Sequence, residues 1–449
     1  MSKIQNMAIT EASYALQSRN ISPVELMQSF LKVSESWEDK LNVWVTMDPE
    51  LAMNSARICE SEISSGIYKG PLHGIPIGVK DIYFTKDMKT TCCSPIYQDF
   101  RSAYDSEPVK LLREAGAVIM GKTVTTQFAC GDPPPTKNPW NLSRTPGGSS
   151  SGSAAGLASG YFSASLGSQT AGSVLRPAAY NGLVGLKPTH GLVSKFGVYP
   201  VAPSLDTMGW FTKSVEDSAI LLQCLAKFDE KDEGSVQTRI PQYSEPLKEI
   251  SPPRIGIVDQ YYSTKSDSET WSALMNLIDK LSKEGAFIKN IAIETDFEEA
   301  LSSHHVIMTS EGASTHSENF KIRPDDYAPH VRKIIETGQQ TNAVDYINAK
   351  KTQRRLHLAV ERALQNIDIL LSPTAMSGAP TPDTTGQPVF QAPWTMAGVP
   401  SINLPYTLDR DGLPLGVQLA AKKFDEANLL SSSLWIEKAV NFSAEPTFV

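Results

Sequence analysis

The sequence predicts an α/β protein in which strands and helices alternate around a largely parallel sheet. Two observations lead to this prediction. Short apolar, strand-like segments recur along the chain, at residues 74–84, 117–120, 183–188, 191–194, 254–259, 286–293, 368–373 and 416–421. Helix-prone segments stand between many of them, at residues 105–116, 268–285 and 425–441. The first two of these helices end at a glycine, which is a common stop signal.

Two further stretches are predicted to be mostly helical. Residues 7–64 contain Ser22-Pro23-Val24-Glu25, a capping box with proline at the first helical position. An apolar face follows it at Leu26, Phe30, Leu31 and Val33. Residues 295–365 are polar and helix-prone, with few strand signals. We therefore expect helices at the start of the chain and in its third quarter.

The composition excludes several classes of protein. The chain has 449 residues, with 41 basic and 49 acidic side chains and a net charge of −8. This acidity disfavours binding to nucleic acids or anionic membranes. No apolar run is long enough to span a bilayer, and the first twenty residues, MSKIQNMAITEASYALQSRN, lack the layout of a secretory signal. We expect a cytoplasmic protein.

The cysteines favour neither a disulfide framework nor a metal site. There are five of them, an odd number, and none has C-x-x-C spacing. That usage fits reduced thiols in a cytoplasmic enzyme. The pairs Cys92/Cys93 and His304/His305 are adjacent, whereas metal ligands converge from separated positions. We therefore expect no metal and no cofactor.

The most unusual segment runs from Gly147 to Ser173. Of its 27 residues, 7 are Gly, 9 are Ser and 5 are Ala. Such a composition is typical of a flexible linker, but an aromatic NPWN precedes it and an apolar GLVGLK follows it. Small residues inside a globular domain permit close backbone approach. We predict an ordered functional segment, with SAAGLASGYF able to pack as a tight helix and SASLG as a short strand.

Two generic motifs also match. Gly116 to Thr123 satisfies GxxxxGK[ST], but a phosphate-binding loop needs a strand before it and a helix after it, and FACGDPPP cannot continue a helix. Gly148 to Gly152 satisfies GxSxG, but no apolar strand leads into Ser150. A P-loop nucleotide-binding protein is thus a distant alternative, and a nucleophile elbow at Ser150 is disfavoured.

The same region resembles the amidase signature family. The resemblance lies in TPGGSSSGSAAGLASG (145–160) and LGSQTAGSVLRPAAYNGLVGLKPTHG (166–191), with GPLHGIPIGVKD (70–81) similar to the family's lysine segment. The C-terminal pattern is matched by DILLSPTA (368–375), QAPWTMAGVPSINLP (391–405) and GLPLGVQLAAKKFDEANLL (412–430). The resemblance covers nearly the whole chain and implies one large α/β domain over residues 1–449. Its central mixed, largely parallel twisted sheet would be covered by helices on both faces.

The resemblance also implies a division of that domain. Residues 1–64 would be N-terminal helices and residues 65–230 the signature core. Residues 235–365 would form a helical cover over the active site, and residues 366–449 the C-terminal part of the core.

Three catalytic residues follow from the resemblance. It implies that Ser173 is the nucleophile, that Ser149 is a bridging hydroxyl preceded by a cis peptide, and that Lys80 is the final proton acceptor. The chemistry is sound, because a serine hydroxyl needs a base to attack an amide and a lysine can serve as that base. An ordinary lysine is charged at neutral pH, so it must be desolvated. The apolar neighbours Ile77, Val79 and Ile82 favour such burial, whereas the adjacent Asp81 leaves the pKa of Lys80 open.

Other site residues are implied by position. Backbone N–H groups of the turn Thr170-Ala171-Gly172-Ser173 would stabilise the oxyanion, and Gln127 would line the substrate side. The chain departs from the family pattern at Gln169, where an acid is usual, at Ala171 in place of a glycine, and at Arg176, one place later than usual. An acid–arginine pair bracing the nucleophile loop is therefore in doubt.

The expected function is hydrolysis of a linear carbon–nitrogen amide bond through a Ser173 acyl-enzyme, releasing a carboxylate and an amine or ammonia. The alternative within the family is the glutaminase-like subunit of a tRNA-dependent amidotransferase. The expected partner is a small amide substrate, and a homodimer is compatible with the sequence. Which amide is cleaved does not follow from the sequence.

Overall fold

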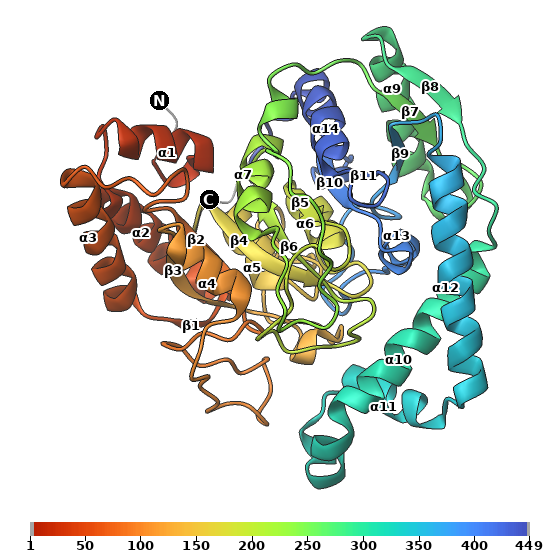
Figure 1. The fold of residues 1–449 in the computed structure, drawn as a ribbon, viewed down its shortest axis with the longest axis horizontal. Helices are drawn as coiled ribbons and strands as arrows, with labels where there is room; N and C mark the ends of the chain where they lie inside the picture. Colours follow the sequence, from red (N-terminus) through yellow and green to blue (C-terminus); the bar gives the residue numbers. More distant parts are fainter. Residues whose placement is uncertain (1–3, 447–449) are drawn as a thin grey trace.

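A mixed sheet of 11 strands runs through the protein (Figure 1). The structure is a computed structural model that describes residues 4–446, apart from the side chains of Gln5 and Pro246. The strand order is β1-β3-β2-β4-β6-β5-β10-β11-β9-β7-β8. The strands are β1 (Trp44–Met47), β2 (Pro76–Lys80), β3 (Val118–Thr123), β4 (Ala164–Gln169), β5 (Val184–Lys187), β6 (Thr207–Thr212), β7 (Arg254–Ile257), β8 (Phe287–Asn290), β9 (Ile369–Pro373), β10 (Ser401–Leu408) and β11 (Pro414–Ala420).

The expected mixed sheet is confirmed, but its parallel share is smaller than the sequence predicted. Parallel pairing joins β2 to β3 and β4, and β7 to β8 and β9. The other six pairings, which include the whole centre from β4 to β9, are antiparallel. The reason is that no helix lies between β10 and β11, which are joined by a short turn, so alternation breaks down there.

Helices cover the sheet. They are α1 (Ile9–Gln17), α2 (Pro23–Leu41), α3 (Pro49–Ser64), α4 (Glu107–Glu114), α5 (Ser151–Ala158), α6 (Leu175–Asn181), α7 (Val215–Leu225), α8 (Tyr262–Lys265), α9 (Ser268–Lys283), α10 (Phe297–Ile322), α11 (Pro329–Gln340), α12 (Ala343–Ala363), α13 (Ala392–Ala397) and α14 (Glu426–Val440). Short 3-10 turns are η1 (Ile4–Asn6), η2 (Gln127–Ala129), η3 (Glu245–Leu247) and η4 (Pro324–Asp326). None of the helices in residues 4–446 combines the length and apolar character needed to cross a bilayer.

Local signals explain where several helices begin. The Ser22 hydroxyl accepts from Glu25 N at 3.2 Å, and Ser22 N donates to the Glu25 carboxylate at 2.8 Å, so the predicted capping box is formed. The side chains of Asp48 and Asp267 accept from the first turns of α3 and α9. The helical stretch predicted over residues 7–64 is interrupted by β1, which lies between α2 and α3.

Some strands were not recognised in the sequence. In β10, Pro405 lies at a register shift against β11, and proline inside a strand normally argues against one. In β6, Gly209 is buried on the backbone of β5, where an added Cβ would lie 2.4 Å from Leu186 O. Conversely, residues 191–194 form no strand, only an isolated bridge between Val193 and Ala226.

The small-residue segment is ordered, as predicted, and forms α5 followed by β4. Its glycines allow α5 to lie directly on the sheet. An added Cβ at Gly152 would meet Val43 O at 2.4 Å and Val124 N at 2.6 Å, and one at Gly156 would meet Phe162 at 2.6 Å. Larger residues would therefore push the helix, and with it the residues that precede it, away from the strands.

The N-terminal helices and the long helices α10, α11 and α12 stand at opposite sides of the molecule (Figure 1). The long helices begin only at Phe297, because β7 and β8 within residues 235–365 are strands of the sheet, and α9 between them packs against β8 and β9. The part of the expected cover that is purely helical is thus α10 to α12.

Candidate active site

The edge where the parallel strands β2 and β4 end brings the candidate residues together. Val79 of β2 is paired with Leu166 of β4. Lys80, the last residue of β2, therefore lies beside the final residues of β4. The turn that carries Ser173 follows β4 directly, and Ser149 precedes α5, which packs on both strands. Residues from three distant parts of the chain therefore meet at one sheet edge.

Lys80 is completely buried and its amine is held by two hydroxyls. Its Nζ donates to Ser149 Oγ at 2.7 Å and to Ser168 Oγ at 2.9 Å. Burial lowers the pKa of Lys80 to about 7, although the nearby Asp206 carboxylate opposes that shift. A substantial fraction of this lysine is therefore an uncharged amine at neutral pH, as a general base must be.

Asp81 does not pair with Lys80. Its carboxylate lies 3.0 Å from Lys122 Nζ, with both side chains fully buried, and accepts from Thr91 Oγ1 at 2.5 Å. Successive residues of an extended chain point to opposite sides, which explains the separation from Lys80. The same contact argues against the distant alternative of a P-loop. Lys122 lies inside strand β3 and is paired with Asp81 there, rather than presented to a phosphate.

The Gly148–Ser149 peptide bond is cis, as the resemblance implied. Ser149 is buried, and its carbonyl accepts from Thr126 N at 3.2 Å. The neighbouring Ser150 exchanges hydrogen bonds of 3.3 and 3.4 Å with the backbone of Ser168. Ser150 is thus tied to the core, which fits the prediction that GxSxG is no nucleophile elbow here.

Ser149 and Ser173 face the same cavity, which has a volume of about 360 Å³. The cavity is lined by Ala129, Cys130, Gly131, Ser149, Thr170, Ala171, Ser173, Arg176, Val201, His305, Met308, His330, Lys333, Ile334 and residues 384–388. Ser173 is half-buried, and no hydrogen bond joins its hydroxyl to another group of residues 4–446. Its side chain is therefore free to turn toward either a substrate or Ser149.

The turn from Thr170 to Ser173 presents unpaired backbone donors. Within residues 4–446, none of its four N–H groups has a protein acceptor. Its carbonyl and hydroxyl groups are instead fixed from outside. Thr170 Oγ1 donates to Asp206 at 2.5 Å, and Ala171 O accepts from Thr395 Oγ1 at 2.7 Å. Thr170 and Ala171 line the cavity, whereas Gly172 is not among the residues that line it.

Gln169 braces the nucleophile loop, for which the sequence had left an acid–arginine pair in doubt. Its Oε1 accepts from Val174 N at 2.9 Å and Leu175 N at 3.0 Å, and its Nε2 donates to Thr395 Oγ1 at 2.9 Å. A neutral amide thus holds the start of α6. Arg176 forms no ion pair with Gln169 and instead donates from Nη2 to Gly148 O at 2.7 Å.

Gln127 is not found among the residues that line the cavity. Its Nε2 donates to Asp326 O at 2.8 Å, and its Oε1 accepts from Ala328 N at 2.6 Å. The amide is therefore used to fasten the segment that leads into α11. Gln127 acts on the cavity through α11, whose His330, Lys333 and Ile334 line it.

Three neighbours of the site were missed in the sequence. Ser168 accepts a hydrogen bond from Lys80, and Asp206 accepts one from Thr170. Thr395 accepts a hydrogen bond from Gln169 and donates one to Ala171 O. Ser168 stands directly before Gln169 in the signature, so its position gave a usable signal. Thr395 lies within the quoted segment 391–405, but the resemblance gave it no role, and nothing in the local sequence of Asp206 points to the site.

One group with metal-ligand proximity lies elsewhere in the described residues. Cys59, Glu62 and His73 have ligand atoms within 4.8 Å of one another. Their atoms already have protein partners, because His73 Nε2 lies 2.8 Å from Glu62, which also binds Lys69 Nζ at 2.7 Å. The donors fit a hydrogen-bonded network better than a metal ion.

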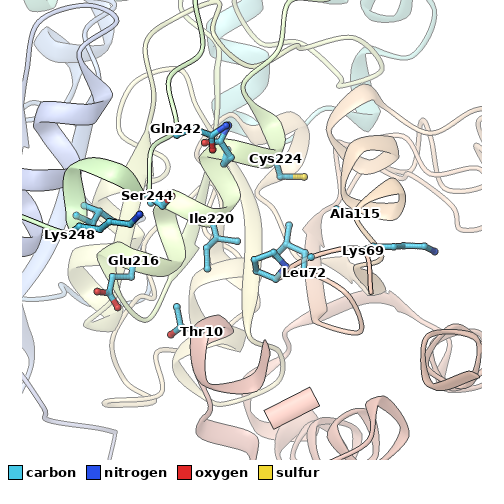
Figure 2. A pocket seen from close by; sticks show the side chains of 15 residues that line it. Thr10, Lys69, Leu72, Ala115, Glu216, Ile220, Cys224, Gln242, Ser244 and Lys248 are labelled. Atoms are coloured by element: carbon cyan, nitrogen blue, oxygen red, sulfur yellow. The ribbon is translucent and has the colours of Figure 1, made fainter. Parts of the chain in front are cut away.

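A separate cavity of about 570 Å³ lies between α1, α4 and α7 (Figure 2). Leu72 and Ile220 stand at its centre, with Glu216 and Lys248 at its margin. Its lining shares no residue with that of the Ser173 cavity.

The chain is similar to known proteins over most of its length. The chain matches the Amidase family over residues 25–430. It is 33% identical to a glutamyl-tRNA(Gln) amidotransferase subunit from Halothermothrix orenii, with 99% of each chain covered. It is 34% identical to the protein of the same name from Trichormus variabilis, covering 97% of this chain and 98% of the relative.

Solved structures are similar over the same length. Peptide amidase from Stenotrophomonas maltophilia superposes with a TM-score of 0.88 at 26% identity, covering 98% of each chain. A structure described as a vestigial protein complex that reveals the origins of an s-triazine catabolic enzyme gives 0.91 at 27% identity, covering 98% of this chain and 100% of that one. The chain therefore belongs to the amidase signature family of hydrolases.

Proposed function

We propose that this protein hydrolyses a linear amide through an acyl-enzyme on Ser173, with Ser149 as the proton relay and Lys80 as the base. The observation that carries the proposal is the buried Lys80 amine, with a pKa near 7, lying 2.7 Å from a hydroxyl that shares a cavity with Ser173. A lysine in this state accepts a proton at neutral pH, whereas an exposed one does not.

In the first half-reaction, the Ser173 oxygen attacks the carbonyl carbon while its proton passes to Ser149 and the Ser149 proton passes to Lys80. The resulting oxyanion is stabilised by the unpaired N–H groups of the turn from Thr170 to Ser173. One such donor typically contributes about 3 kcal/mol to the transition state. The proton then returns through Ser149 to the leaving nitrogen, the carbon–nitrogen bond breaks, and an amine or ammonia departs.

In the second half-reaction, water attacks the ester of Ser173 and its proton follows the same path to Lys80. Collapse of the second oxyanion breaks the ester bond, and Ser173 recovers its proton through Ser149. The carboxylic acid leaves and gives its proton to solvent, so a carboxylate is released and Lys80 is again uncharged. No metal or cofactor is required by these steps.

A second candidate is the glutaminase-like subunit of a tRNA-dependent amidotransferase. The observation that favours it is the full-length similarity to glutamyl-tRNA(Gln) amidotransferase subunits at 33–34% identity. Such a protein would pass ammonia to a partner rather than release it. The homodimer and the cytoplasmic location stay predictions from the sequence.

The test is hydrolysis by the purified chain without partners, measured as ammonia release from simple primary amides. Added hydroxylamine should be converted to the hydroxamate, since an acyl-enzyme transfers its acyl group to either nucleophile. Ser173→Ala should abolish both products. Activity that requires a partner fraction would favour the amidotransferase role, and full activity in Ser173→Ala would reject the acyl-enzyme.

A further inference from the structure

A histidine of the long helix α10 holds the turn that carries Ser173. His304 is buried, and its Nε2 lies 2.9 Å from Thr170 O. A carbonyl oxygen can only accept a hydrogen bond, so the ring proton is on Nε2. Burial lowers the pKa of His304 to about 4, so the ring is uncharged at neutral pH. The contact is therefore a neutral N–H donor on a backbone carbonyl of the turn.

The carbonyl that His304 binds belongs to the same peptide group as the N–H of Ala171. The bond between Thr170 and Ala171 is trans, and in a planar trans peptide the carbonyl and the N–H point in opposite directions. Fixing Thr170 O therefore fixes the direction of the Ala171 N–H. A carbonyl that accepts a hydrogen bond also polarises the N–H of its own peptide group, which makes that N–H a stronger donor. Ala171 lines the candidate cavity, and its N–H has no acceptor within residues 4–446.

The next peptide group of the turn is fixed in the same way. Ala171 O accepts from Thr395 Oγ1 at 2.7 Å, which directs the N–H of Gly172. Two successive N–H groups are thus oriented by hydrogen bonds at the opposite ends of their peptide groups. An oxyanion hole needs this arrangement, because its donors must be oriented before the negative charge develops.

The helix α10 is itself fixed relative to the turn. Glu311, two turns after His304, accepts from Ser204 N at 2.9 Å and from the Ser204 hydroxyl. Asp206, two residues beyond Ser204, accepts from Thr170 Oγ1 at 2.5 Å. Thr170 is therefore held at its hydroxyl by the loop before β6 and at its carbonyl by α10. The carbonyl cannot rotate without breaking one of these hydrogen bonds.

We propose that His304 is a positioning residue of the reaction, which aims the Ala171 N–H at the oxyanion of the tetrahedral intermediate. The inference rests on the proposed amide hydrolysis and adds to it a residue that lies outside the catalytic motifs. The helix α10 then takes part in the chemistry as well as in enclosing the cavity. A merely structural histidine would affect stability, but not the rate of the chemical step.

The experiment compares two amide side chains at position 304 by kcat and KM for a simple primary amide. In His304→Gln the amide nitrogen reaches about as far as Nε2, whereas in His304→Asn it reaches only as far as Nδ1. We expect His304→Asn to lower kcat about tenfold or more and to leave KM within about twofold, because the oxyanion exists only after attack. His304→Gln should keep kcat within about threefold of the unmodified protein. Thermal melts of the same samples give the folded fraction, to which kcat is normalised.

His316 provides the matched control. It is also a buried histidine of α10, but its Nδ1 lies 3.2 Å from the Tyr327 hydroxyl and not at the turn. His316→Asn should leave kcat within about twofold. Equal losses of kcat in His304→Asn and His304→Gln, or in His304→Asn and His316→Asn, would overturn the inference. An unchanged kcat in His304→Asn, with or without a rise in KM, would overturn it as well.

A second measurement separates this inference from the proposed function, namely the rate at which a fluorophosphonate labels Ser173. Attack on phosphorus also places negative charge on an oxygen, so His304→Asn should slow labelling and His304→Gln should preserve it. If simple amides are not hydrolysed but labelling follows this order, the proposed hydrolysis fails and the role of His304 stands. Equal labelling rates in the two variants overturn the inference whether or not amides are hydrolysed. Absence of label on Ser173 in the unmodified protein overturns both proposals.

Discussion

Lys80 is the residue on which the proposed chemistry depends most. It reaches the site as the last residue of a buried strand, and within residues 4–446 its amine has no carboxylate partner, only the hydroxyls of Ser149 and Ser168. A hydroxyl can accept a hydrogen bond from the charged amine but cannot compensate its charge, so burial dominates the pKa. The Asp81 carboxylate would raise the pKa of Lys80 if it faced the Lys80 amine, but it is paired with Lys122 instead.

Replacing Lys80 with methionine should lower kcat by at least about a hundredfold, since general-base help is worth roughly 10²–10⁴. The fold should survive, because an apolar chain of similar length replaces a buried amine. Steady-state kinetics and a thermal melt on the same sample check both statements. Near-normal turnover at neutral pH would contradict the base assignment.

The pH dependence of kcat/KM should show an acidic limb with a pKa of about 7, the value to which burial lowers Lys80. The sign follows from the mechanism, because only the uncharged amine accepts a proton. Activity should therefore rise with pH through 7 and fall about tenfold per unit well below it. Lys187 is a second buried lysine with a pKa lowered to about 7, so melts across the same range must show that the fold is unchanged.

At the scale of elements, the site depends on how closely α5 approaches the sheet. Gly152 and Gly156 lie where any side chain would strike the backbone of Val43 and Val124 or the ring of Phe162. Ser149 lies two residues before the start of this helix, so the depth of α5 sets the distance between the hydroxyl of Ser149 and the amine of Lys80. The composition of residues 147–173 is therefore a packing requirement.

Gly152→Ala should destabilise the protein by about 3 kcal/mol or more, at the upper end of the usual cost of overpacking. The new methyl group would meet two backbone atoms, which cannot rotate away as a side chain could. Urea denaturation followed by circular dichroism measures the change. Ala158→Ser, at the half-buried end of the same helix, should change stability by no more than about 0.5 kcal/mol.

At the scale of the whole molecule, the core and the helices α10 and α11 enclose the cavity together. Gln127 is one link between them, because it joins η2 of the core to the backbone of Asp326 and Ala328 just before α11. The side chains that α11 contributes to the cavity therefore depend on a glutamine that does not itself line it.

Gln127→Ala should raise KM by about threefold to tenfold with a smaller effect on kcat. The reason is that the lost hydrogen bonds, worth about 1 kcal/mol each, loosen α11 and not the catalytic residues. Kinetics with a simple primary amide provide the measurement, and Gln353→Ala, which removes an amide bonded to Met396 O outside the cavity, is the control. A kcat that falls as far as in Lys80→Met would place Gln127 in the chemistry instead.

Much of this arrangement could be predicted from the sequence. Most strands were found because segments such as β2, β3 and β9 are short apolar runs. Lys80, Ser149 and Ser173 could be proposed as catalytic residues because they lie in recognisable motifs. The antiparallel centre was not foreseen, since β6 and β10 contain a glycine and a proline that normally argue against strands. Asp206 and Thr395 could not be found, because their contacts depend on tertiary packing over long sequence separations.

The most direct test of the central claim is covalent labelling with a fluorophosphonate, followed by mass mapping of the labelled peptide. We expect the label on Ser173, a labelling rate that rises with pH through about 7, and no label in Ser173→Ala. Label on Ser150, or undiminished labelling and activity in Ser173→Ala, would contradict the account.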